Sequence, residues 1–391
     1  MKTLGLYLHI PFCISKCAYC DFYSLPQTQA QFRESYIHAL IRHMEEYSIQ
    51  ARDYTVTSVY FGGGTPTLMT GEQIKQLMRA IKKNFRLSEK CEISMESNPG
   101  TADYDKLKIM KRAGINRLSI GVQSFCDELL QSCGRIHTSG EVYDIVTNAR
   151  RAGFKNISLD LMFGLPGQTK QQLMESLKQA FELNPEHISL YGLKVEEGTL
   201  FWHNRNTLPL PDEDTERDMY FSAVGFMKLN GYMQYEISNF AQKGFECRHN
   251  LRYWNADEYL GLGAAAHSYF GGKRFSFKKN AGLYIDAFNP EKRLDESIID
   301  EYIDIPPSAR IAEYVMLRFR LCMGIDCERF KKRFGRSFEE IYIERISPYL
   351  ASGHIIRTAR GYAFSPEGMY VSNYILSRII DFDLIIPGSD S

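Results

Sequence analysis

Residues 7–20 read Tyr-Leu-His-Ile-Pro-Phe-Cys-Ile-Ser-Lys-Cys-Ala-Tyr-Cys, and they indicate both a fold and a site. The apolar residues up to Ile10 are typical of a β-strand at residues 3–10. Directly after this strand, Cys13, Cys17 and Cys20 lie in one short loop. Three clustered cysteines at the end of a strand indicate a metal-binding loop.

Outward from this loop, strand-like and helix-like segments alternate as far as residue 232. Five further strands are expected at residues 55–61, 91–97, 117–122, 156–162 and 187–193. Such alternation predicts a parallel sheet with right-handed crossovers. We therefore expect an α/β fold in which residues 1–232 form a partial (β/α)6 TIM-like barrel, with functional residues at the C-terminal ends of its strands.

The second half of the chain has a different pattern. Residues 233–300 are rich in Tyr, Phe, Gly and Asn and are expected to form a connecting region of short strands and loops. Residues 301–391 are mostly helical, with two short strand-like segments, 354–359 and 361–365. They predict a smaller α+β C-terminal domain with a winged-helix-like end.

Charge and cysteine content exclude several classes of protein. The 47 Lys and Arg residues balance 47 Asp and Glu residues, which disfavours a nucleic-acid-binding module despite the basic residues 331–333. No apolar run approaches the roughly 18 residues of a membrane span, and the N-terminus lacks a signal-peptide pattern. An odd number of cysteines, nine, disfavours a secreted disulfide framework. We expect a cytoplasmic protein.

The three clustered cysteines match an iron–sulfur site better than a zinc site. Zinc prefers four ligands, and no second Cys or His pair lies at zinc-finger spacing. Electron-transfer [4Fe-4S] clusters use four protein ligands, so three cysteines would leave one iron open to a small molecule. Simple burial of the three cysteines is the remaining alternative.

Two further segments could cradle such a molecule. Gly62-Gly63-Gly64-Thr65 follows the second expected strand; glycines let the backbone approach a ligand and expose N–H groups, or simply allow a tight turn. Glu96 ends the next strand, where a carboxylate can accept hydrogen bonds from hydroxyl groups or lie at the surface.

The cysteine loop resembles that of the radical S-adenosylmethionine (SAM) superfamily. Its opening, Tyr-x-His-Ile-Pro-Phe-Cys, is similar to the family that contains oxygen-independent coproporphyrinogen III dehydrogenase (HemN) and the heme chaperone HemW. This resemblance covers nearly the whole chain. It implies a [4Fe-4S] cluster on Cys13, Cys17 and Cys20, with SAM bound at the open iron and contacted by Tyr7, Tyr19, Gly63, Gly64, Thr65, Glu96, Gln123, Arg135 and Asp160.

Three features favour the chaperone branch of this family. The dehydrogenase has a fourth cysteine two positions after the third ligand, and this chain has Phe22 at that position. The dehydrogenase also has a substantial segment before its Tyr-x-His-Ile-Pro motif, and we do not expect such a segment here. His249-Asn-Leu-Arg-Tyr-Trp254 matches an HNxxYW pattern that resembles the heme-binding motif of the chaperone. His249 is the expected heme ligand, although a lone histidine beside aromatic residues is more often structural; His267 is a weaker candidate.

The resemblance thus implies a protein that binds heme and transfers it to apo-hemoproteins. The acceptors would include membrane-bound respiratory cytochromes, and the protein would act as a homodimer that meets the membrane through its partners. The alternative is a coproporphyrinogen III dehydrogenase, an enzyme that produces protoporphyrinogen IX by radical oxidative decarboxylation.

Overall fold

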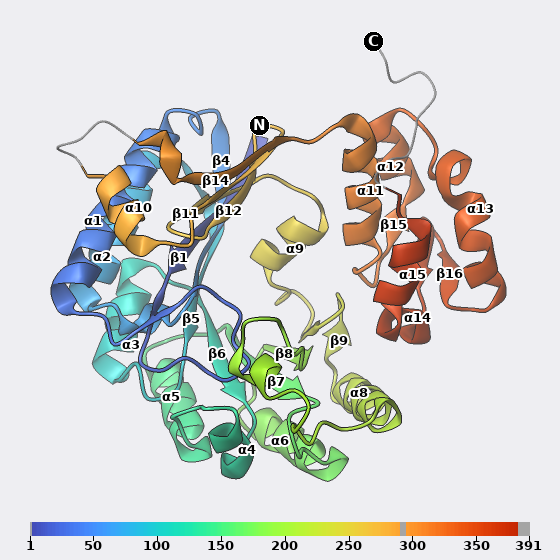
Figure 1. Ribbon diagram of the computed structural model, residues 1–391, viewed down its shortest axis with the longest axis horizontal. Helices are drawn as coiled ribbons and strands as arrows, with labels where there is room; N and C mark the ends of the chain where they lie inside the picture. Colours follow the sequence, from blue (N-terminus) through green and yellow to red (C-terminus); the bar gives the residue numbers. More distant parts are fainter. Residues whose placement is uncertain (1, 290–294, 382–391) are drawn as a thin grey trace.

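A computed structural model describes residues 2–289 and 295–381. A large twisted sheet with helices on its outer face occupies one side of the molecule, and a small helical domain lies on the other (Figure 1). Helix α9 (Arg248–Trp254) lies between the two (Figure 1).

The six expected strands are confirmed, and they lie side by side in chain order, all parallel. The first is fully buried at Leu4, Leu6, Leu8 and Ile10, because strands of a parallel sheet are covered on both faces. Among the described residues the sheet does not close into a barrel. Its parallel strands are β1 (Lys2–Ile10), β4 (Tyr54–Gly63), β5 (Leu87–Ser97), β6 (Arg117–Gln123), β7 (Ile157–Phe163) and β8 (His187–Gly192).

The crossover helices begin and end where local signals place them. In α2, for example, Thr70 Oγ1 accepts from Gln73 N (3.2 Å) and Gln73 Oε1 accepts from Thr70 N (3.0 Å), which forms a capping box. Across the described ranges, no helix combines the length and apolarity needed to cross a membrane. The helices are α1 (Ala30–Ser48), η1 (Pro66–Leu68), α2 (Gly71–Asn84), α3 (Tyr104–Ala113), α4 (Asp127–Ser132), α5 (Ser139–Arg151), α6 (Lys170–Glu182), α7 (Leu200–His203) and α8 (Glu213–Leu229).

The connecting region extends both edges of the same sheet. Strand β10 (Asn239–Ala241) pairs antiparallel with β8, and β9 (Met233–Gln234) pairs antiparallel with β10. The chain then passes through α9 to the opposite edge, where β11 pairs parallel with β1. The short strands are as expected, whereas α9 and α10 are not, because seven residues are too few to show a helical period. The edge comprises β11 (Tyr259–Leu262), β12 (His267–Phe270), β13 (Lys273–Phe277), α10 (Ala281–Ala287), η2 (Glu296–Ile298) and β14 (Ile299–Asp304).

The C-terminal domain has its own hydrophobic core, which includes Phe319, Phe330, Phe338 and Tyr342. Its small antiparallel sheet has the order β15-β17-β16, as expected for a helical domain with a terminal hairpin. The predicted boundary at residue 300 falls within β14. The elements are α11 (Pro307–Arg318), β15 (Ile325–Asp326), α12 (Cys327–Phe334), α13 (Phe338–Ala351), β16 (Ile355–Thr358), β17 (Gly361–Phe364), α14 (Pro366–Tyr370) and α15 (Ser372–Ile379).

Candidate functional site

The cysteine loop lies at the carboxyl end of β1, between the short strands β2 (Phe12–Cys13) and β3 (Leu25–Pro26). These two strands pair with each other and close the base of the loop. Cys13, Cys17 and Cys20 are all half-buried and free of disulfides. The loop therefore presents three thiols on a fixed backbone.

Burial and neighbouring groups set the state of these thiols. Cys13 Sγ and Thr65 Oγ1 lie 3.7 Å apart, and Arg135 Nη1 donates to Cys17 Sγ at 3.6 Å. Burial raises the pKa of Cys20 to about 11, so without a cation nearby this thiol is protonated at neutral pH. A coordinated metal ion would instead hold these thiols as thiolates, because a bound cation deprotonates its thiol ligands.

The three thiols suit a cluster rather than a single ion. Among residues 2–289 and 295–381, no three Cys, His, Asp or Glu side chains converge as ligands of one metal ion. A cubane relaxes this requirement, because each thiolate binds a different iron. The three cysteines line one cavity of about 470 Å³, together with Ser97, whose buried hydroxyl has no hydrogen-bond partner among the residues that the structure describes. A buried hydroxyl without a partner fits a cavity that receives a polar ligand.

This cavity, the cluster cavity below, brings together most of the residues expected at the site. Apart from Tyr19 of the cysteine loop, they come from the neighbouring strands β4 to β7 and from the loops that follow them, which is where such folds place their sites. Tyr7 and His249 do not line it. The expected residues that do are Tyr19, Gly63, Gly64, Thr65, Glu96, Gln123, Arg135 and Asp160.

The glycine triplet is explained by packing within the protein. A Cβ on Gly64 would lie 2.6 Å from Phe12 O, and one on Gly63, whose φ is +109°, would lie 2.5 Å from the His9 ring. Gly63 N donates to Glu96 Oε2 (3.1 Å), and Gly64 N donates to a backbone carbonyl of β1. The expectation that these glycines expose free N–H groups is therefore wrong. Their role is to let the end of β4 approach the cysteine loop.

Two half-buried carboxylates face the cluster cavity. Glu96 Oε1 accepts from Tyr60 OH at 2.9 Å, and burial raises the pKa of Glu96 to about 7. Burial also raises the pKa of Asp160. Each carboxylate keeps lone pairs for hydroxyl groups of a ligand. Asp160 accepts from three serines that sequence reasoning missed, although they recur on successive strands: Ser119, Ser158 and Ser189.

Arg135 contacts the cysteine loop at Cys17 and is also linked to the ends of the strands through Asn98, a residue that sequence reasoning also missed. Arg135 Nη2 donates to Asn98 Oδ1 (2.9 Å), and Asn98 Nδ2 donates to Thr65 Oγ1 (2.9 Å). The signal was available, since an Asn-Pro pair directly after a strand marks a fixed turn. Nearby, Gln123 has a φ of +66°, an uncommon conformation for a residue other than glycine. Such backbone strain clusters at functional sites.

Tyr7 and the HNxxYW segment border a second cavity of about 560 Å³, the aromatic cavity below. Asp21 and Phe22, which follow Cys20, line both cavities. Tyr7 lines only the aromatic cavity, and its hydroxyl lies 3.1 Å from His9 Nδ1. The cysteine loop and the HNxxYW segment, which lie far apart in the sequence, therefore meet across one shared wall.

His249 is buried (1% exposed) in the first turn of α9. Its Nδ1 lies 3.0 Å from Ser58 Oγ, and its Nε2 lies 2.8 Å from Tyr253 OH. Burial lowers the pKa of His249 to about 3, so the ring is neutral. In this conformation neither ring nitrogen is free to bind iron. Tyr253, one helical turn on, is the member of the motif that lines the aromatic cavity.

Two family models match separate parts of the chain. Residues 7–180 match the family model described as Radical SAM superfamily, and residues 305–371 match the HemN C-terminal domain. Coproporphyrinogen III oxidase (HemN) from Escherichia coli, a solved structure, aligns with 97% of this chain and 91% of its own chain at a TM-score of 0.84 and 23% identity. That likeness shows a shared fold.

Curated relatives match over their whole length. The heme chaperone HemW of Bacillus subtilis is 37% identical over 96% of this chain and 98% of its own. The heme chaperone HemW of Lactococcus lactis is 34% identical over 98% of this chain and 99% of its own. The heme chaperone HemW of Escherichia coli is 33% identical over 97% of this chain and 99% of its own. With this similarity across both domains, the chain belongs to the HemW family of the radical SAM superfamily.

Proposed function

We propose that this protein is a heme chaperone that binds heme and passes it to apo-hemoproteins. The observation that carries the proposal is the shared wall between the cluster cavity and the aromatic cavity. The family relatives are named as heme chaperones. The aromatic cavity gives this chain a place for a flat, largely apolar cargo beside its cysteine loop.

A radical SAM domain implies a [4Fe-4S] cluster and SAM, and the residues of the cluster cavity fit both. We assign the cluster to Cys13, Cys17 and Cys20. Cluster and SAM together supply one-electron cleavage of a carbon–sulfur bond of SAM. In the chain itself, Glu96 would accept hydrogen bonds from ribose hydroxyls, and Arg135, which donates to Cys17 Sγ, would place its positive charge beside the Cys17 thiolate. The other residues that would contact SAM line the same cavity: Tyr19, Gly63, Gly64, Thr65, Gln123 and Asp160.

Phe22 supports a chaperone over the alternative dehydrogenase. It occupies the position of the fourth cysteine of the dehydrogenase loop, and it is 66% exposed. An exposed phenylalanine at a cavity mouth is an apolar surface that a ligand can cover.

The proposal extends to partners and location. Residues 1–232 would hold the cluster and SAM, residues 233–300 would supply most of the aromatic cavity, and residues 301–391 would cover it. Acceptors would be apo-hemoproteins, including membrane-bound respiratory cytochromes, met by a homodimer at the cytoplasmic side of the membrane. The balance of 47 basic and 47 acidic residues supports a protein without a nucleic-acid partner.

The test uses anaerobically reconstituted protein, titrated with heme and then mixed with membranes that contain a heme-depleted b-type cytochrome. We expect one heme per chain and faster recovery of the cytochrome spectrum than with free heme. Cys20→Ala should lose the cluster and slow transfer, whereas Cys322→Ala, a cysteine of the C-terminal domain, should do neither. Turnover of coproporphyrinogen III without stable heme binding would instead establish the dehydrogenase.

A further inference from the structure

The aromatic cavity lies between the two halves of the molecule. Its walls come from the segment after Cys20, the end of α9, strands β11 to β13 and helix α11 of the C-terminal domain. Its volume of about 560 Å³ is in the range of cavities that hold drug-sized ligands. The cavity therefore has room for a ligand much larger than water.

Its surface suits a flat ring system. Tyr253 and Tyr259 stand edge to face, with ring centroids 4.6 Å apart, and both line the cavity. Phe22, Tyr269 and Leu317 add further apolar surface from other walls. Aromatic rings provide large contact areas with defined geometry, which matches the two faces of a porphyrin.

Of the two histidines that line this cavity, only His267 has a free ring. His9 Nε2 lies 2.8 Å from Tyr23 O, and its Nδ1 lies close to Tyr7 OH. His267 is exposed, and in the described parts of the chain no hydrogen bond to its ring is found. Partial desolvation by the surrounding protein lowers the pKa of the His267 ring although its surface stays accessible, and this favours the neutral imidazole that binds metals.

Cationic groups lie at the same cavity. Lys279 is exposed and lines it, and so does Arg274, which pairs with Glu313. Although Asp21 and Asp257 also line this pocket, positive charges beside its aromatic wall match the propionates of heme, since Lys and Arg bind carboxylates.

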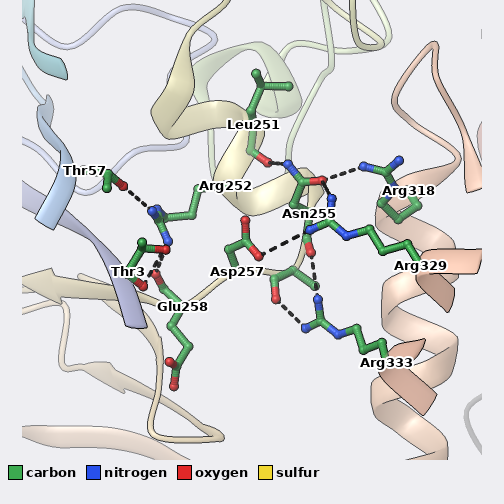
Figure 2. Close-up of polar contacts among 11 residues, drawn as sticks. Thr3, Thr57, Leu251, Arg252, Asn255, Asp257, Glu258, Arg318, Arg329 and Arg333 are labelled. Carbon is green, nitrogen blue, oxygen red and sulfur yellow. Dashed lines mark hydrogen bonds and ion pairs between the residues drawn. The ribbon is translucent and has the colours of Figure 1, made fainter. Parts of the chain in front are cut away.

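The wall formed by α9 is fixed to the wall formed by the C-terminal domain. Arg318 Nη1 donates to Asn255 Oδ1 (2.5 Å), and Arg333 Nη2 donates to Ala256 O (2.7 Å) (Figure 2). Arg329 donates to the same Asn255 oxygen at 3.4 Å (Figure 2). Three arginines thus hold the residues that follow the HNxxYW motif against the helices that cover the cavity.

From these observations we propose that the aromatic cavity is the heme site, with His267 as the axial ligand of the iron and Lys279 at a propionate. This assignment rests on the proposed chaperone function and specifies its site. His249 is then a positioning residue that holds Tyr253 against the cargo, and the HNxxYW motif contributes a wall of the pocket instead of the iron ligand.

Heme titrations of three histidine variants, with cluster content measured in parallel, test the assignment. His267→Ala should bind heme at least tenfold more weakly, shift the Soret band, and regain the wild-type band when free imidazole is added. His249→Gln, which keeps a polar side chain beside Tyr253, should bind more weakly without a change of band position. His38→Ala, on the outer face of α1 and exposed, should match wild type.

A cavity-filling variant separates failure of this site from failure of the proposed function. Leu317→Trp, whose site lies on α11 at the cavity wall, should reduce heme binding at least tenfold while cluster content stays unchanged. If wild type binds heme but His267→Ala and Leu317→Trp bind it equally well, the heme lies elsewhere and this assignment is wrong. If wild type binds no heme at all, the chaperone function itself fails.

Discussion

Gly64→Ala tests whether the glycine triplet serves the packing of the cysteine loop. The added Cβ would lie 2.6 Å from Phe12 O, whereas ordinary contact begins at 3.4 Å, so the two backbones must separate by about 0.8 Å. The shortest hydrogen bond across this junction runs from Thr65 N to Phe12 O at 2.7 Å, and such a shift stretches and weakens it. Overpacking costs roughly 1–3 kcal/mol, and each lost hydrogen bond adds about 1 kcal/mol.

Thermal and urea unfolding of the cluster-free protein measure this loss, and iron and sulfide content after reconstitution measure the effect on the loop. We expect Gly64→Ala to be about 2–4 kcal/mol less stable and to retain less cluster. Gly225→Ala is the matched control, since Gly225 is exposed inside α8 with open space around its Cβ position. It should gain up to about 1 kcal/mol. Equal stability and cluster content in Gly64→Ala and wild type would refute the packing argument.

Three further predictions each concern one side chain: Glu96, Arg333 or Ser189. Burial raises the folded-state pKa of Glu96 from its usual 4.5 to about 7, so the contribution of this carboxyl to the free energy of unfolding falls as the pH rises from 4.5 to 7. In urea unfolding of the cluster-free protein, Glu96→Gln should lack this pH dependence and should be more stable than wild type at pH 8. Arg333→Ala removes two hydrogen bonds to the end of α9, and should speed limited proteolysis between the two halves, whereas Arg336→Ala should not. Ser189→Ala removes a 2.6 Å hydrogen bond to half-buried Asp160 and should cost about 1.5–3 kcal/mol in urea unfolding. An unchanged free energy of unfolding would mean that the Asp160 carboxyl is protonated or hydrated there.

Much of the fold and the cluster cavity could be predicted, because their signals are local. Most of the parallel strands contain a short apolar run, and β5 and β6 carry cavity residues, Glu96 and Gln123, at or next to their last position. The roles of the glycines and of His249 could not be predicted in this way. They depend on which atoms of β1 and β4 lie beside them, and those contacts join residues that are 50 to 190 positions apart.

The HNxxYW pattern itself follows from the position of α9 between three parts of the molecule. His249 and Tyr253 are four residues apart, so they lie on one helical face; His249 meets Ser58 of β4 and Tyr253 meets the aromatic cavity. Trp254 points elsewhere, with its ring 5.8 Å from the Arg320 guanidinium of the C-terminal domain. Arg252 bonds to Thr3 O, Glu258 O and Thr57 Oγ1 at the opposite edge of the helix (Figure 2). Helix α9 is thus anchored on the sheet, the aromatic cavity and the C-terminal domain at once. On the proposed heme assignment, this position makes the motif a wall of the site without any of its members binding the iron.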